Sequence, residues 1–115
     1  MAEEKTYEHK IKQFLTDEGA YWVKFFANGY TRSGIPDLLC CVNGYFVAVE
    51  VKATRGHASP LQIHNCNRIR EAGGFAFILY PSGFEEFKNI IYGLNCDRYD
   101  TDLPLVLKGE KRKNE

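Results

Sequence analysis

The chain has 115 residues, of which 44% are hydrophobic and 26% charged, and its 15 Lys and Arg residues balance its 15 Asp and Glu residues. This length allows one domain with one hydrophobic core, and the apolar content excludes a largely disordered chain. No run reaches the ~20 apolar residues of a membrane span and the first ten residues are rich in charge, so we expect an intracellular protein without a membrane segment.

The first two predicted elements are a helix over residues 4–18 and a strand over residues 20–27. The helix is predicted because apolar residues recur at helical spacing before Gly19, a helix stop signal. These apolar residues are Tyr7, Ile11, Phe14 and Leu15. Aromatic and β-branched residues dominate residues 20–27, and the Asn28-Gly29 pair is expected to end the strand.

A β-hairpin is predicted next, with strands over residues 35–42 and 45–53. The Asn43-Gly44 pair between them is typical of a type I′ turn, because both residues tolerate the positive φ that this turn requires. Pro36 can stand only near the beginning of its strand, since proline donates no hydrogen bond to the ladder.

The second half of the chain is predicted to hold two helices around a buried strand. Ser59 and Pro60 are typical of a helix start, so we expect a helix from residue 60 to residue 72. Residues 75–80 are wholly apolar, as in a central strand covered on both faces. An amphipathic helix is predicted over residues 84–94.

These elements predict an α/β fold of one domain over residues 1–107, followed by a basic mobile tail over residues 108–115. Their order is αβββαβα, which indicates a mixed sheet flanked by helices. The cysteines follow no metal-binding spacing, so we expect them to be reduced and buried. They are Cys40, Cys41, Cys66 and Cys96.

Two charged residues interrupt the apolar strand over residues 45–53. Glu50 and Lys52 are two positions apart, so their side chains share one face, while Val47, Val49 and their alternating neighbours form the core face. A surface ion pair on an edge strand explains the two charges without any chemistry.

Asp37 gives that pair a possible chemical purpose. Counting back from the turn, Val42 faces Tyr45, so Asp37 is expected opposite Glu50. Two adjacent carboxylates repel each other unless a positive charge lies between them. A divalent cation meets that need, since Mg²⁺ prefers one or two carboxylates together with water and substrate phosphate.

Three motifs in succession carry a family resemblance: GIPDLL at residues 34–39, VEVK at residues 49–52 and SPLQ at residues 59–62. Together they resemble the PD-(D/E)xK nuclease superfamily, most closely its VRR-type nuclease domain, and the layout is similar to that of archaeal Holliday-junction resolvases. The resemblance covers residues 4–80. It implies a restriction-endonuclease-like fold with an αβββαβ core, and metal-dependent cleavage of DNA phosphodiester bonds.

The resemblance also implies roles for particular residues. Asp37, Glu50 and the main-chain carbonyl of Val51 match the ligands of Mg²⁺ or Mn²⁺. Lys52 matches the lysine that positions the attacking water and stabilises charge on the phosphate. Glu8 matches an acid of the first helix that completes the site in catalysis and metal binding.

Two of these assignments leave alternatives open. Periodicity does not choose between Glu4 and Glu8 as the helix acid, and a carboxylate near a helix N-terminus is also favoured by the helix dipole. Gln62 matches a catalytic glutamine of the family, but a capping box with Ser59 explains the same residue. One side chain is not expected to perform both roles at once.

DNA contacts are expected from basic residues on the side of the site, with Tyr30 stacking on an unpaired base or packing internally. The basic set is Lys24, Arg32, Arg55, His57 and Arg68.

No recognition helix is evident, so the predicted substrate is branched DNA such as a four-way junction or a flap, cut by a homodimer without a small-molecule cofactor. The compact size suits a phage or mobile-element protein. The alternatives are a non-catalytic DNA-binding module on the same fold and a small α/β protein-interaction domain.

The zero net charge does not exclude DNA as the partner, because the charges are unevenly distributed. Residues 19–70 contain six Lys and Arg residues and two acids, Asp37 and Glu50. We therefore expect a locally positive site with weak affinity for plain duplex DNA.

Overall fold

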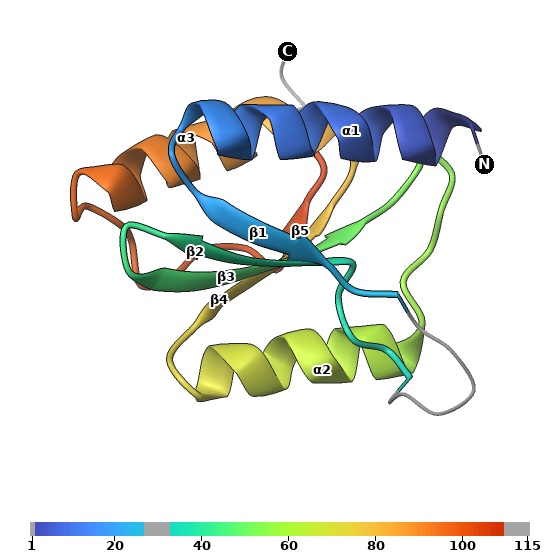
Figure 1. Ribbon diagram of the computed structural model, residues 1–115. Helices are drawn as coiled ribbons and strands as arrows, with labels where there is room; N and C mark the ends of the chain where they lie inside the picture. The colour runs from blue at the N-terminus through green and yellow to red at the C-terminus, as the bar shows by residue number, and fades with distance from the viewer. Residues whose placement is uncertain (1, 27–32, 110–115) are drawn as a thin grey trace, which may run out of the picture.

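The computed structural model describes residues 2–26 and 33–109, which form a sheet between two layers of helices (Figure 1). The mixed α/β architecture with a sheet flanked by helices is confirmed. Its elements are α1 (Ala2–Asp17), β1 (Tyr21–Lys24), β2 (Leu38–Val42), β3 (Tyr45–Val51), α2 (Pro60–Glu71), β4 (Phe75–Leu79), the short 3-10 helix η1 (Pro81–Gly83), α3 (Phe84–Asn95) and β5 (Val106–Leu107).

The sheet has five strands in the order β1-β2-β3-β4-β5. The first three strands are antiparallel, whereas β4 runs parallel to β3 and β5 runs parallel to β4. Asn43 and Gly44 have φ values of 50° and 86°, as the predicted turn requires. The predicted hairpin register is confirmed, since Val42 pairs with Tyr45.

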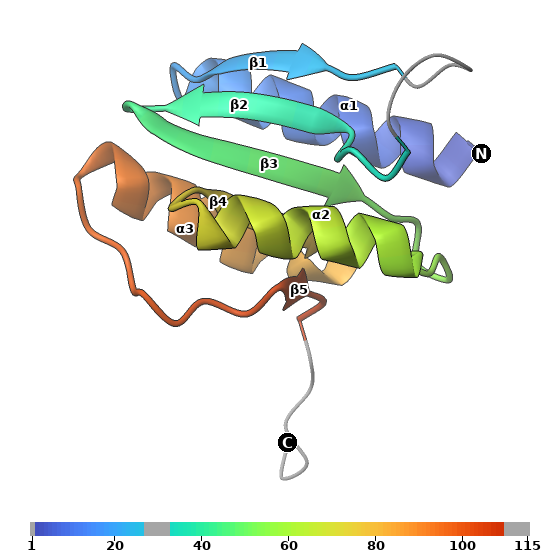
Figure 2. The ribbon, with the colours of Figure 1, turned by 90° about the horizontal axis from the view of Figure 1, so that it is seen from below.

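Both faces of β3 are buried. Helices α1 and α3 cover one face of the sheet and α2 covers the other (Figure 1). Val47, Val49 and Val51 belong to the larger core cluster, beneath α1 and α3, as predicted. The expectation of a single core face is wrong, because Ala48 lies in a second cluster with Cys66 of α2. Seen from below, α2 lies across β3 and β4 (Figure 2).

The bounds of β1, β2 and β3 differ from the predictions by more than one residue. β1 is shorter than residues 20–27, and β2 begins at Leu38, after Pro36 and Asp37. β3 ends at Val51, yet the next residue, Lys52, still donates its amide to the carbonyl of Leu79. The chain therefore leaves the regular ladder at the point where the charged motif residues stand.

The segment after α3 contains β5, a two-residue strand that sequence periodicity did not predict. Its Leu107 is fully buried, and the amide of Tyr80 donates to the Leu107 carbonyl at 3.0 Å. Of the predicted tail, Lys108 and Gly109 are described, and Ser82 donates a hydrogen bond to the Lys108 carbonyl. Residues 110–115 lie outside the described residues.

The cysteine prediction is half correct. All four are free thiols; Cys40 and Cys66 are buried, but Cys41 and Cys96 are exposed. The side chain of Cys41 on β2 points to the face opposite Cys40 and is exposed there. Its apolar neighbours in the sequence do not indicate this exposure. Among the described helices, none combines the length and the apolar character needed to cross a bilayer.

Candidate active site

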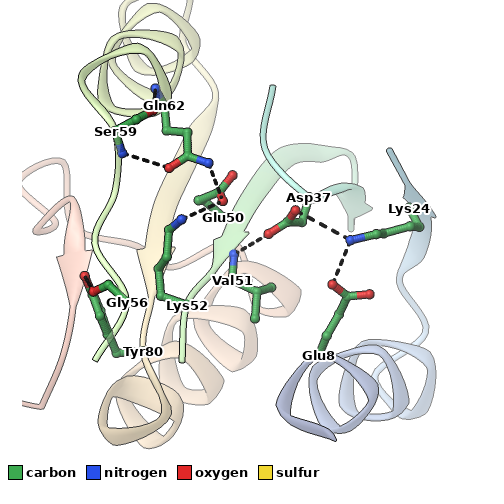
Figure 3. A network of polar contacts seen from close by, with 10 residues as sticks. All are labelled: Glu8, Lys24, Asp37, Glu50, Val51, Lys52, Gly56, Ser59, Gln62 and Tyr80. Atoms are coloured by element: carbon green, nitrogen blue, oxygen red, sulfur yellow. Dashed lines mark hydrogen bonds and ion pairs between the residues drawn. The ribbon is translucent and has the colours of Figure 1, made fainter. Parts of the chain in front are cut away.

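Six polar side chains from five chain segments come together at one end of the sheet (Figure 3). Asp37 stands directly before β2. Glu50 is the next-to-last residue of β3, and Lys52 directly follows that strand. Gln62 comes from the first turn of α2, above the same strand end. Lys24, at the end of β1, and Glu8, on α1, approach from the side opposite to Gln62.

Asp37 and Glu50 are neighbours, as the hairpin register predicts. Leu38 pairs with Val49, so the next step of the ladder sets Asp37 beside Glu50. Oδ2 of Asp37 accepts the Val51 amide at 2.8 Å, which fixes the carboxylate over the end of β3. This side-chain bond replaces the ladder bond that a regular strand residue would make.

Glu50 is a buried carboxylate, with 3% of the residue exposed. Its Oε2 accepts from Nε2 of Gln62 at 3.0 Å and forms an ion pair with Nζ of Lys52 at 3.3 Å. Its Oε1 is buried and has no hydrogen-bond partner among the described residues. Burial, and secondarily the charge of Asp37, raises the pKa of Glu50 to about 7 despite the attraction of Lys52.

The unpartnered oxygen of Glu50 beside a second carboxylate fits a divalent cation. Leaving a buried carboxylate oxygen without a partner is costly, and a cation removes that cost. No group of three or more His, Cys, Asp or Glu side chains suited to a metal occurs within residues 2–26 and 33–109. Two carboxylates are nevertheless the usual protein share for Mg²⁺, which keeps water and substrate phosphate as its other ligands.

Gln62 forms the capping box of α2 and also contacts Glu50, while its catalytic role stays a prediction. Its side-chain Oε1 accepts the backbone amide of Ser59 at 2.9 Å. The backbone amide of Gln62 donates to Oγ of Ser59 at 3.1 Å, which completes the capping box of α2. Its Nε2 is then free to donate to Glu50 (Figure 3). Capping therefore does not prevent contact with Glu50, contrary to expectation, because the oxygen and the nitrogen of the side-chain amide serve different partners.

Glu8, rather than Glu4, is the acid of α1 that reaches this network. Its Oε1 lies 2.8 Å from Nζ of Lys24, and its Oε2 lies 3.0 Å from Nζ of Lys12. Partial burial raises the pKa of Glu8, but the hydrogen bonds from Lys24 and Lys12 outweigh this effect, so the net shift is downward. Glu8 is therefore held as a carboxylate.

Lys24 is enclosed by acids and does not lie free on the surface, and its contact with DNA stays a prediction. Its ammonium sits between Glu8 and Asp37, at 3.5 Å from Oδ1 of Asp37, and the side chain is 20% exposed. The strand was correctly predicted, but the two acids that face Lys24 come from other elements. Lys24 thus links the acid of α1 to the carboxylate pair.

The other predicted DNA contacts are distributed over and beyond this end of the sheet. Arg55 and His57 are exposed in the loop that follows Lys52. Arg68 is exposed two turns along α2 and pairs with Glu71 at 3.7 Å, so it lies away from the carboxylates. Arg32, like Tyr30, falls outside the described residues.

The sequence did not single out Tyr80, which holds the Arg55 and His57 loop in place. Its hydroxyl donates to the Gly56 carbonyl at 2.8 Å, and its own carbonyl accepts from the Tyr7 hydroxyl at 2.7 Å. A tyrosine at the end of an otherwise apolar strand was the available signal, because a buried hydroxyl needs a partner.

The raised pKa of Glu50 predicts a pH-dependent stability of the metal-free protein. The folded-state pKa of about 7 exceeds the ordinary 4.5, so the folded state binds the proton more tightly. This group's contribution is complete below about pH 4.5 and is lost as pH rises through 7. In EDTA, melting temperatures from pH 5 to pH 8 should fall for the wild type relative to Glu50→Gln. A gap that stays constant with pH would contradict the shift.

Comparison with known families adds one finding. The family model described as archaeal Holliday junction resolvase (Hjc) matches residues 2–80, which run from α1 through β4. The predicted kinship with these resolvases is confirmed, and the finer likeness to VRR-type nuclease domains stays a prediction. No curated protein and no solved structure matches the chain.

Proposed function

Because the chain belongs to the archaeal Holliday junction resolvase family, a family of nucleases, we propose that it is a metal-dependent endodeoxyribonuclease that cuts branched DNA. One observation carries the metal dependence. Oε1 of Glu50 is buried without a partner beside the carboxylate of Asp37, which is the arrangement that a cation would complete.

In this proposal Mg²⁺ or Mn²⁺ would be held by Asp37, by Oε1 of Glu50 and by the Val51 carbonyl, with Glu8 helping directly or through water. When bound, the ion supplies a water of lowered pKa and neutralises charge that develops on the scissile phosphate. Each carboxylate keeps one oxygen engaged with the protein, namely with Val51 for Asp37 and with Gln62 for Glu50. Oε1 of Glu50 has no partner among the described residues and would be open to the ion, whereas Oδ1 of Asp37 lies 3.5 Å from Nζ of Lys24 and would face the ion beside that ammonium.

Lys52 is assigned to the phosphate and the attacking water. Its side chain is 13% exposed, and its ammonium lies 3.3 Å from Oε2 of Glu50, beside the carboxylate pair. From there it orients the nucleophile and stabilises negative charge in the transition state. Gln62 acts one step back, because it fixes the Glu50 carboxylate on which Lys52 rests.

The charge distribution supports a substrate recognised by its structure. Lys24 and Lys52 are largely buried against acids. Among the described residues, Arg55, His57 and Arg68 are exposed, Arg68 in a surface pair with Glu71, and these three are proposed to contact phosphates. So few contacts give weak binding to plain duplex DNA. A homodimer would place two active sites for paired cuts in a four-way junction. We propose that the protein acts inside the cell and is encoded by a phage or a mobile element.

The proposal predicts cleavage that depends on both metal and DNA structure. Purified protein is incubated with fluorescent four-way junctions, flaps, linear duplexes and single strands, in Mg²⁺, in Mn²⁺ and in EDTA. We expect nicks in the branched substrates, loss of all cleavage in EDTA, and little cleavage of linear duplex. Binding without cleavage by a folded protein would favour a DNA-binding module, and neither binding nor cleavage would favour a protein-interaction domain.

A further inference from the structure

Phe26 is the most exposed of the large apolar side chains described, with 75% of the residue accessible to solvent. It lies two residues beyond the end of β1. The amide of Phe25 still donates to the carbonyl of Asp37 at 2.8 Å, so the backbone beside Phe26 stays tied to the backbone of the active site. An exposed ring on an anchored segment is costly in water and is available to a partner.

The ring of Phe26 stands at the edge of the carboxylate network. Nζ of Lys24 lies 5.8 Å from the ring centroid and 3.5 Å from Oδ1 of Asp37. The distance from the ring centroid to Oδ1 of Asp37 is therefore no greater than the sum of 5.8 Å and 3.5 Å. That separation suits a nucleotide whose phosphate is at the carboxylates and whose base is at the ring.

Among the described residues, Tyr21 is a second strongly exposed aromatic residue, and it lacks this placement. Tyr21 is 71% exposed on the same strand, but it pairs with Cys41 at the opposite end of β1. Tyr21 lies three positions before Lys24, about 10 Å away along the strand. Its side chain also points to the other face of the sheet, because exposure alternates along β1. Tyr21 is therefore a matched control for Phe26.

Building on the proposed nuclease function, we propose that Phe26 stacks on an unpaired base at the branch point, next to the phosphate that is cut. Every base offers a π-face, so such stacking tolerates any sequence. In a continuous duplex both faces of each base are already stacked on neighbours, whereas the base pairs that meet at a branch point have no continuous stack across it and can open to expose a face. Phe26 thus supplies a physical reason for preferring branched DNA that phosphate contacts alone do not supply.

The test is a double-mutant cycle between the protein and the DNA. Affinities are measured by fluorescence anisotropy, with Ca²⁺ replacing Mg²⁺, for wild type, Phe26→Ala, Phe26→Trp and Tyr21→Ala. The probes are a four-way junction, a linear duplex, and junctions that each carry one abasic nucleotide beside the branch point. Cleavage of the intact junction in Mg²⁺ is measured in parallel for kcat and KM.

We expect Phe26→Ala to weaken junction binding at least about fivefold, the lower range for losing one base–aromatic stack, with a matching rise in KM. Duplex affinity should not change, and Phe26→Trp and Tyr21→Ala should resemble wild type. An abasic nucleotide at one position should weaken wild type but not Phe26→Ala, because the stack is already absent.

Three results would overturn this inference. They are an unchanged junction affinity of Phe26→Ala, an equal loss on junction and duplex, and additive effects of Phe26→Ala with every abasic position. Each of them leaves the nuclease proposal standing as long as wild type cuts junctions. A wild type that neither binds nor cuts any branched DNA would overturn the nuclease proposal and this inference with it.

Discussion

Replacing Asp37 by asparagine is expected to lower the rate of metal-dependent DNA cleavage by about a hundredfold to a thousandfold, the range typical of deleting one group that stabilises developing charge. The amide carries no charge for the cation, and its Nδ2 would face Lys24 in place of Oδ1. The rate is measured on a four-way junction at saturating Mg²⁺. Binding of Mn²⁺, followed by calorimetry, should weaken in parallel.

The fold of Asp37→Asn should survive, which separates this result from simple destabilisation. The asparagine oxygen can still accept the Val51 amide, and Lys24 keeps Glu8 as its partner at 2.8 Å. Removing the Asp37 charge also removes one cause of the raised pKa of Glu50. The melting temperature in EDTA should therefore stay equal or rise slightly.

Asp102→Asn is the matched control for this experiment, because Asp102 is an exposed loop residue beyond α3. It should cut at the wild-type rate and bind Mn²⁺ as the wild type does. Cleavage by Asp37→Asn within a few-fold of the wild type would contradict the assignment of Asp37 as a metal ligand. The catalytic carboxylate would then have to be sought elsewhere in the chain.

The carboxylate pair was predictable from the sequence because turn chemistry and strand periodicity are local. The Asn43-Gly44 turn fixes which residues of β2 and β3 face each other, and that register carries Asp37 to Glu50. Strand alternation then sets Glu50 apart from the valines beside it. Both inferences need only residues that lie close along the chain.

The partners of Lys24 were not predictable in the same way. Glu8 and Asp37 lie 16 and 13 residues away from it along the chain, on other elements. Periodicity assigns a residue to a face of a strand, but it does not say which acids another element brings over that face. An isolated lysine therefore resembled a solvent-exposed DNA contact, although it is enclosed by two carboxylates.

The sequence did not predict that Gln62 caps α2 and contacts Glu50 at the same time, for a different reason. A capping box is recognised from the residues at its two positions, which leaves the direction of the glutamine amide undetermined. Once the Ser59 amide engages Oε1, Nε2 must point away from the cap, and Glu50 lies there. The strand β5 was missed because its two residues are too few to show a period.

The part of the chain beyond the family match contributes directly to the core. The match ends at residue 80, yet α3 follows it and places Phe87, Ile91 and Leu94 in the larger core cluster. Phe87 is fully buried, and its ring packs edge-to-face on Phe14 of α1 and on Phe77 of β4. The family-matched elements therefore depend on α3 to cover their apolar face.

Replacing Phe87 by alanine should lower the free energy of unfolding by about 3–5 kcal/mol, the usual cost of emptying a buried phenylalanine site. The loss comprises the transfer of the ring from water and the cavity left between α1, α3 and β4. Urea unfolding followed by far-UV circular dichroism measures it in the metal-free protein. An effect of this size is a large part of the stability of a domain of this length.

The same experiment tests whether residues 1–107 unfold as one domain. Asn89→Ala, an exposed substitution on the same helix, should stay within about 0.5 kcal/mol of the wild type. Phe87→Ala should keep one transition with an unchanged slope against urea, shifted to lower urea concentration, because α3 shares its core with α1 and β4. Two separate transitions, with the sheet unaffected by the loss of Phe87, would show that α3 is an appendage and that the resolvase core is stable without it.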